Sequence, residues 1–294
     1  MSDDPSPLVE MRGITKRYGG VTAVDSVDFS IYPGEIHALV GDNAAGKSTL
    51  VKCLSGAVAR DRGDILLNGE PVDIRTPRDA KRLGIETVYQ DLALADNLDV
   101  AANLFLGREI MCTGIARPFM NIRRMEREAE ALLQRLKISL PNIRQRVRTM
   151  SGGQRQCVAI ARSIYFNAQL IILDEPTAAL GVKETEMVFG LIRDMRDQGH
   201  TLVMISHNLN HVFDMCDRIT VMYAGQEVGQ LTLDTLGFGR ADTLEDLVKK
   251  MEGVNGLHLM PVMWESVVPR IITEAGLLPQ GFVPPEPKEK KVPA

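Results

Sequence analysis

The 294-residue sequence has no apolar run that approaches the length of a membrane-spanning helix. Its cleanest apolar segments, such as residues 170–173, have the length of a β-strand. If the protein works at a membrane, we therefore expect it to bind there through another polypeptide or at the surface. The acidic N-terminal residues 1–7 also lack the apolar core of a signal peptide.

Closely spaced cysteines and an excess of positive charge are missing too. The four cysteines form no C-x-x-C pair and lie far apart, at Cys53, Cys112, Cys157 and Cys216. This spacing argues against a zinc site and a disulfide framework, and it suits a reducing cytosol. The formal net charge of −4 provides no electrostatic attraction to nucleic acid. With 45% hydrophobic and 24% charged residues, the composition is that of an ordinary globular protein.

A glycine-rich loop stands between a predicted strand, residues 36–40, and an apolar helical pattern that begins at Leu50. The loop reads Gly41-Asp42-Asn43-Ala44-Ala45-Gly46-Lys47-Ser48-Thr49. This is the G-x-x-x-x-G-K-[ST] pattern of a phosphate-binding loop, in which backbone N–H groups and the following helix N-terminus face phosphate oxygens. Lys47 supplies a positive charge for the β- and γ-phosphates, and Ser48 a hydroxyl for Mg²⁺. A plain glycine turn would not need both of these side chains.

Two further apolar strands end in polar residues. Residues 170–173 run into Asp174 and Glu175, and residues 201–205 run into Ser206 and His207. Ligands of open α/β sheets bind at the carboxyl ends of strands, so these side chains are expected on the same edge as Lys47. Asp174 can hold Mg²⁺, and Glu175 can polarise an attacking water. For His207, position alone leaves a structural and a functional role equally open.

Two other segments have an ambiguous pattern. Tyr18 could stack on an adenine ring, but its spacing alone favours an ordinary surface tyrosine. Ser151 is a candidate N-cap for a helix, and the residues from Ser151 to Gln154 form a possible anion-binding helix end. Taken alone, this second segment fits a capped helix with a flexible entry better.

The remaining pattern predicts an alternation of strands and helices. Predicted strands cover 8–14, 27–32, 64–67, 71–72, 85–89, 219–223 and 227–231. A helix is predicted after the N-cap Thr76, and another after the N-cap Asn121 within a helical stretch at about 91–138. Further predicted helices cover 183–198 and 242–251. Asn68-Gly69 predicts a hairpin turn, and Gly199 predicts the end of the helix 183–198. The proline- and charge-rich end of the chain predicts a flexible tail over 254–294.

In this order, the glycine-rich loop, Gln90 after a strand, the Ser151–Gln154 segment, the Asp174-Glu175 pair and His207 resemble the nucleotide-binding subunit of ATP-binding cassette transporters. The resemblance covers about residues 8–253. Residues 88–109 are similar to the branch that imports ribose, xylose, fructose and related monosaccharides. The resemblance to the cassette family implies an α/β fold: a P-loop ATPase core with a mixed or parallel sheet, an N-terminal antiparallel β subdomain and an α-helical subdomain at about 91–165.

The resemblance also implies a role for each matching position. Residues 41–49 would bind the triphosphate of ATP, and Tyr18 would stack on its adenine. Glu175 would be the general base and His207 would contact the γ-phosphate, with Lys47 as the third catalytic residue. Mg²⁺ would be held by Ser48, Gln90 and Asp174. The γ-phosphate of an ATP held by a second subunit would be capped by Ser151, Gly152, Gly153 and Gln154.

The same resemblance implies partners and a location. The first partner is a second cassette subunit, most simply a second copy of this chain, because the sequence has one glycine-rich loop and one Ser-Gly-Gly-Gln segment. The other partners are integral membrane permease subunits and, indirectly, a periplasmic or surface sugar-binding protein. The chain would be peripheral on the cytoplasmic face of the inner membrane and bind no nucleic acid. Import of another small solute, a non-transport role on ribosomes or DNA, and an ATP-gated clamp without turnover stay as alternatives. The absence of basic arms and long coiled coils counts against the second, and Glu175 with His207 against the third.

Three positions depart from the family pattern. Ala44 stands where glycine is common, and a positive φ there would cost about 1 kcal/mol. Met150 replaces a leucine, which is a mild change. Gly181 stands where aspartate is frequent, which puts a contact across the dimer in doubt.

Overall fold

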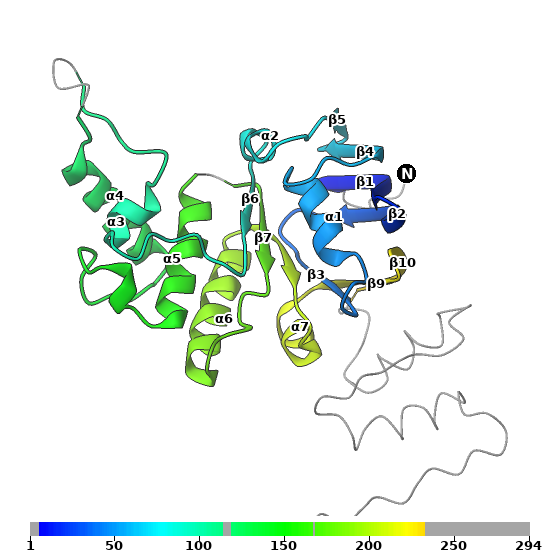
Figure 1. Ribbon diagram of the computed structural model, residues 1–294. Coiled ribbons are helices and arrows are strands. Elements are labelled where there is room, and N and C mark those ends of the chain that lie inside the picture. The colour runs from blue at the N-terminus through cyan, green and yellow to red at the C-terminus, as the bar shows by residue number, and fades with distance from the viewer. Residues whose placement is uncertain (1–5, 114–118, 167, 233–294) are drawn as a thin grey trace, which may run out of the picture. The chain divides into compact units, whose positions relative to one another are not determined.

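The computed structural model describes residues 6–113, 119–166 and 168–232, all within one compact unit that covers residues 1–233 (Figure 1). The predicted helix 242–251 and the predicted tail 254–294 lie outside these residues. The strands are β1 Val9–Tyr18, β2 Val21–Ile31, β3 Ile36–Gly41, β4 Arg62–Leu67, β5 Glu70–Val72, β6 Ile85–Val88, β7 Leu170–Asp174, β8 Thr201–Ile205, β9 Arg218–Tyr223 and β10 Gln226–Thr232. The helices are α1 Lys47–Leu54, α2 Pro77–Arg82, α3 Val100–Leu104, α4 Ile122–Arg135, the 3-10 helix η2 Val147–Thr149, α5 Gly152–Tyr165, α6 Val182–Asp197 and α7 Leu209–Met215.

A six-stranded sheet has the order β10-β9-β3-β8-β7-β6. All neighbours from β9 to β6 are parallel, and only β10 runs antiparallel. In the register of this sheet, Ile205 at the end of β8 lies between Leu39 of β3 and Asp174 of β7. The carboxyl ends of these strands are therefore level with one another.

The central strands β3, β8 and β7 are mostly apolar because both faces of the sheet are buried, although β3 also buries His37 and β8 buries Thr201. In β7, Ile171 and Leu173 contribute to a core shared with α4, α5, α6 and α7. Leu170 and Ile172 point to the opposite face and join a core with α1 and the antiparallel strands. The two-residue period of a strand thus divides one apolar run between two cores.

The N-terminal part forms a four-stranded antiparallel sheet in the order β2-β1-β4-β5, which confirms the predicted β subdomain. The predicted turn joins β4 to β5, with positive φ angles of 52° at Asn68 and 81° at Gly69. β1 and β2 are longer than predicted. Register shifts interrupt their pairing, and Ser26 has a positive φ of 53°, so the simple alternation of apolar residues is lost there.

The predicted helical stretch over about 91–138 is helical only in part, and the structure confirms Asn121 as the N-cap of α4. The described residues there contain only the short α3 and, separately, α4. The buried Asn103 side chain bonds the backbone N–H and C=O of Ala95 and the C=O of Asp99, which fixes the chain before α3 as a loop. Gly107, at φ 78°, turns the chain soon after α3. No helix in the described ranges is both long and apolar enough to cross a membrane.

Candidate active site

The carboxyl ends of β3, β8, β7 and β6 bring most of the predicted site residues to one edge of the six-stranded sheet (Figure 1). The loop 41–49 follows β3, His207 follows β8, Asp174 ends β7, and Gln90 follows β6. These segments are far apart in the sequence. The parallel register alone places them side by side, as the edge rule predicts.

The loop 41–49 wraps around the ammonium group of Lys47. Its Nζ donates hydrogen bonds to the carbonyl oxygens of Gly41, at 2.8 Å, and Asp42, at 2.9 Å. Burial lowers the pKa of Lys47, while the charges of Glu175, Asp42 and Asp174 oppose that shift. The charges of these three carboxylates therefore act on a cation that the loop holds through two carbonyl oxygens.

Two backbone positions of the loop need their observed residues for different reasons. Gly46 has φ 98°, and a Cβ there would lie closer than 3.0 Å to the carbonyl oxygen of Ala23 in β2. Ala44 has φ 68°, the left-handed conformation that costs an L-residue about 1 kcal/mol. The loop therefore keeps a conformation typical of glycine at a position where this chain has alanine.

Glu175 and His207 are in direct contact at the sheet edge. The His207 Nδ1 lies 2.9 Å from Oε1 and 2.8 Å from Oε2 of Glu175. The Glu175 side chain is 19% exposed, whereas that of His207 is 69% exposed. Glu175 also has a positive φ of 51°, and its N–H donates to the carbonyl oxygen of Ile205 at 3.0 Å. The carboxylate is thus held from its backbone and by one imidazole nitrogen.

Asp174, next to Glu175, sits in a mixed electrostatic environment. Burial raises its pKa, and the Glu175 charge adds to the rise, while Lys52 and Lys47 act against it. A divalent cation beside this carboxylate would favour its ionised form. Ser48, at the start of α1, and Gln90, after β6, are both exposed at the same sheet edge.

The segment from Ser151 to Gln154 lies at the start of α5. The Ser151 N–H donates to Gln154 Oε1 at 3.1 Å, and the Gln154 N–H donates to Ser151 Oγ at 3.4 Å. This reciprocal pair is a capping box, and it confirms the predicted N-cap. We call Ser151, Gly152 and Gly153 the α5 N-terminus.

One residue at the α5 N-terminus was not predicted from the sequence. Glu184, in the first turn of α6, places its carboxylate oxygens 3.6 and 3.9 Å from where a Cβ on Gly152 would stand. The same carboxylate accepts a hydrogen bond from the Gly181 N–H at 3.3 Å. The sequence signal is weak, because an acidic residue in a first helical turn normally serves its own helix.

Tyr18 ends β1 next to the turn into β2, the strand that contacts the loop through Ala23. Its side chain is exposed, and Lys16 Nζ lies 5.7 Å from the ring centroid. The ring is therefore available for stacking, with a cation on one side of it.

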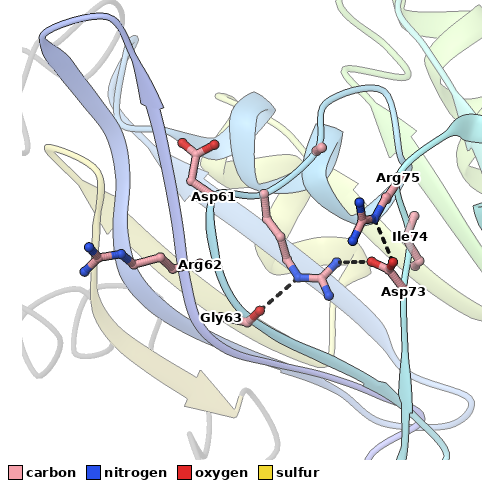
Figure 2. A pocket seen from close by; sticks show the side chains of 8 residues that line it. Asp61, Arg62, Gly63, Asp73, Ile74 and Arg75 are labelled. Atoms are coloured by element: carbon pink, nitrogen blue, oxygen red, sulfur yellow. Dashed lines mark hydrogen bonds and ion pairs between the residues drawn. The ribbon is translucent and has the colours of Figure 1, made fainter.

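A hollow of about 300 Å³, between the start of β4 and the segment after β5, contains none of the predicted site residues (Figure 2). Its cations are largely paired. Arg75 Nε lies 2.7 Å and Arg60 Nη1 3.5 Å from the Asp73 carboxylate, and Arg60 Nε donates to the Gly63 carbonyl at 2.9 Å. Because Asp73 shares both guanidinium groups, the hollow is not a strong anion site.

The fold and this edge define a P-loop protein: a parallel sheet, a glycine-rich loop closed around a lysine after β3, and an acidic pair at the end of β7, with β8 between these two strands. A family described as "ABC transporter" matches residues 24–178, which is 155 of the 294 residues. The chain belongs to the ABC transporter family, and the fold class implied by the sequence resemblance is confirmed.

Relatives with assigned names are similar over most of this chain. The fructose import ATP-binding protein FrcA of Rhizobium meliloti is 51% identical over 226 residues, which is 76% of this chain and 87% of the relative. A ribose import ATP-binding protein, RbsA 1 of Rubrobacter xylanophilus, is 44% identical over 247 residues, 84% of this chain. The match spans 47% of that ribose relative, or about half of its length.

A solved structure has the same fold at low sequence identity. It is the dimeric structure of a post-hydrolysis state of an ATP-binding cassette bound to ADP and Pi. The TM-score is 0.63 at 23% identity, over 76% of this chain and 98% of the other.

Proposed function

We propose that this chain binds and hydrolyses ATP at the edge of the six-stranded sheet and thereby powers import of a monosaccharide through a membrane permease. The observation that carries the proposal is the convergence of the loop 41–49, the Asp174-Glu175 pair and His207 at that edge. The names of the fructose and ribose import relatives supply the substrate class and the direction of transport.

In the proposed reaction, the loop 41–49 holds the triphosphate of ATP. Lys47 has an ammonium group that already lies among oxygen acceptors of the loop, and phosphate oxygens would take the place of those acceptors. Tyr18 would stack on the adenine, because its ring is exposed beside the strand that contacts the loop. The loop and Tyr18 would thus hold the two ends of the nucleotide.

Glu175 would accept a proton from the attacking water while the oxygen of that water bonds to the γ-phosphorus and the bond from the γ-phosphorus to the leaving ADP oxygen breaks. His207 supports this role as a positioning residue as well as a γ-phosphate contact, because its Nδ1 lies 2.8 Å from the carboxylate. Inorganic phosphate and ADP are then the products, and the proton is left on Glu175.

The residues present fit a Mg²⁺ ion. Ser48, Gln90 and Asp174 offer a hydroxyl, an amide and a carboxylate oxygen, and Mg²⁺ prefers oxygen ligands. The described residues contain no cluster of three or more His, Cys, Asp or Glu side chains that could hold a metal ion by themselves. When bound, Mg²⁺ would neutralise charge that develops on the phosphates. Asp174 and Ser48 would hold it, and Gln90 would contact it and the water.

A second copy of the chain would complete each site. In a head-to-tail dimer, the α5 N-terminus and Gln154 would cap the γ-phosphate of the ATP held by the other copy, because a capped helix start offers N–H donors to an anion. The dimeric cassette named among the structural relatives is consistent with such a pair. We assign residues 8–253 to this nucleotide-binding domain and about 91–165 to its helical subdomain.

The permease would dock near Gln90 on the cytoplasmic face of the inner membrane, and a periplasmic or surface sugar-binding protein would deliver the sugar to the permease. Co-purification with a membrane protein of several spans is the expected result of a pull-down from membranes. Recovery with ribosomes instead would contradict the transport role, and a permease that moves another small solute would correct the substrate class.

The Glu175→Gln variant tests the catalytic assignment. We expect ATP turnover to fall by about 100- to 10,000-fold, the range for removal of a general base, while ATP binding persists. Glu186→Gln is the matched control, because Glu186 is exposed on α6 and its ion pair with Arg193 is long, at 3.9 Å. Equal turnover in Glu175→Gln and the parent protein would refute the role of Glu175. A trapped variant that stays monomeric with ATP and permease would refute the dimer.

A further inference from the structure

The proposed reaction does not use the contact of Glu184 with the α5 N-terminus. Glu184 belongs to α6, yet its Cβ lies 2.9 Å and its Cγ 3.3 Å from where a Cβ on Gly153 would stand. Any side chain at Gly153 would therefore collide with Glu184. The close approach of α5 and α6 brings the carboxylate over the first residues of α5.

The contact is electrostatic as well as steric. A hydrogen bond from the Ser151 side chain, together with N–H groups of Gly181, Gly153 and Gly152, lowers the pKa of Glu184. The carboxylate is thus ionised at neutral pH, at a helix start that carries a partial positive charge. Glu184 is half-buried, whereas its neighbours Lys183 and Glu186 are exposed.

Gly181 explains why this carboxylate is available to two helices. It is the N-cap of α6 and has no side chain with which to accept the free N–H groups there. Glu184 accepts the Gly181 N–H at 3.3 Å and faces the α5 N-terminus at the same time. One anion therefore serves the starts of both α5 and α6.

We propose that Glu184 is an internal anion that covers the α5 N-terminus in the separate subunit and competes with the γ-phosphate of the partner's ATP. This inference rests on the proposed function, because it concerns the same Ser151, Gly152 and Gly153 donors. When the dimer closes, the phosphate takes these donors and the Glu184 carboxylate moves away from them. Closure therefore requires ATP to outcompete a charge that the protein itself supplies.

The charge of Glu184 separates this role from that of a plain helix cap. Glu184→Gln keeps the shape and an acceptor oxygen of the side chain but removes its charge. If Glu184 only caps the helix starts, the ATP-dependent dimer of this variant should be as stable as the parent dimer or weaker. A competing anion predicts the opposite, namely that the neutral variant closes more readily on ATP. Each homodimer contains two α5 N-termini, so the change in the free energy of dimerisation is twice the change at one of them.

The experiment compares ATP-dependent dimers by sedimentation in the hydrolysis-deficient Glu175→Gln background. We expect Glu184→Gln to lower the dimer dissociation constant at saturating ATP about fivefold, since each helix start contributes about a two- to threefold change. Glu186→Gln removes the same charge two residues further along α6 and should leave the constant unchanged. Glu184→Ala removes the acceptor as well and should tighten the dimer at least as much as Glu184→Gln.

ATP binding to each monomer's own loop is measured in parallel, because it does not involve Glu184 and reports that the variants are folded. An unchanged or weaker dimer in folded Glu184→Gln, or equal tightening by Glu186→Gln, would overturn the proposal. If the Glu175→Gln parent itself fails to dimerise with ATP, the proposed dimer is wrong. If the parent closes and Glu184→Gln does not differ from it, only the role of Glu184 is wrong.

Discussion

Substitution of Gly46 by alanine isolates the contact between the glycine-rich loop and the antiparallel sheet. Gly46 has φ 98°, and the new Cβ would meet the carbonyl oxygen of Ala23 within 3.0 Å and the Met222 Cε at 3.3 Å. The left-handed backbone costs an L-residue about 1–2 kcal/mol. Displacement of packed neighbours adds about 1–3 kcal/mol. We expect Gly46→Ala to lower the free energy of unfolding by about 2–5 kcal/mol, measured by urea denaturation.

Gly69→Ala is the control that carries the backbone cost without the collision. Gly69 has φ 81° in the β4–β5 turn, and a Cβ there would meet nothing within 4 Å. Its expected loss is therefore about 1–2 kcal/mol. Gly46→Ala should also weaken ATP binding, because the displaced loop carries Lys47. Equal losses of stability in the two variants would refute the argument that the contact with Ala23 requires glycine.

Three further predictions follow from other parts of the molecule. Tyr18→Ala should weaken ATP binding about 3- to 10-fold in a titration, whereas Tyr18→Phe should bind ATP as the parent protein does. Equal binding by the parent protein and both variants would exclude stacking. At pH 8 a thiol reagent should label Cys112 of the native protein, since Cys53, Cys157 and Cys216 are buried and burial raises the pKa of Cys53 to about 11 and of Cys157 to about 12; rapid labelling of several thiols, counted by mass spectrometry, would contradict this. Burial lowers the pKa of His37 below its usual 6.5, so the unfolded chain binds more protons and stability should fall as the pH drops below about 6.5. His37→Gln should reduce that pH dependence in unfolding experiments, and an unchanged slope would refute the assignment to His37.

Much of the candidate site could be predicted because its signals are local. The loop 41–49 is recognisable in the sequence because its residue types stand at a fixed spacing. The strand predicted before it and the helix predicted after it are both present, as β3 and α1. The strands before Asp174 and His207 are recognisable because burial on both faces requires uninterrupted apolar runs. Conversely, the predicted helical stretch 91–138 is helical only over α3 and α4, because the bonds of the Asn103 side chain to the backbone stabilise a loop before α3 and Gly107 turns the chain after it.

The contacts that complete the site depend on the order of strands in the sheet, which differs from their order in the chain. β7 pairs with β8, although 26 residues of loop and helix separate the end of β7 from the start of β8, and on its other side β8 pairs with the much earlier β3. The pairing of β7 with β8 is why His207 reaches the Glu175 carboxylate, and neither residue's sequence neighbours indicate it. The contact of Glu184 with the α5 N-terminus likewise arises only when two helix starts approach each other. A sequence pattern therefore identifies which side chains belong to such a site. The order of the strands in the sheet and the packing of the helices determine which of these side chains contact one another.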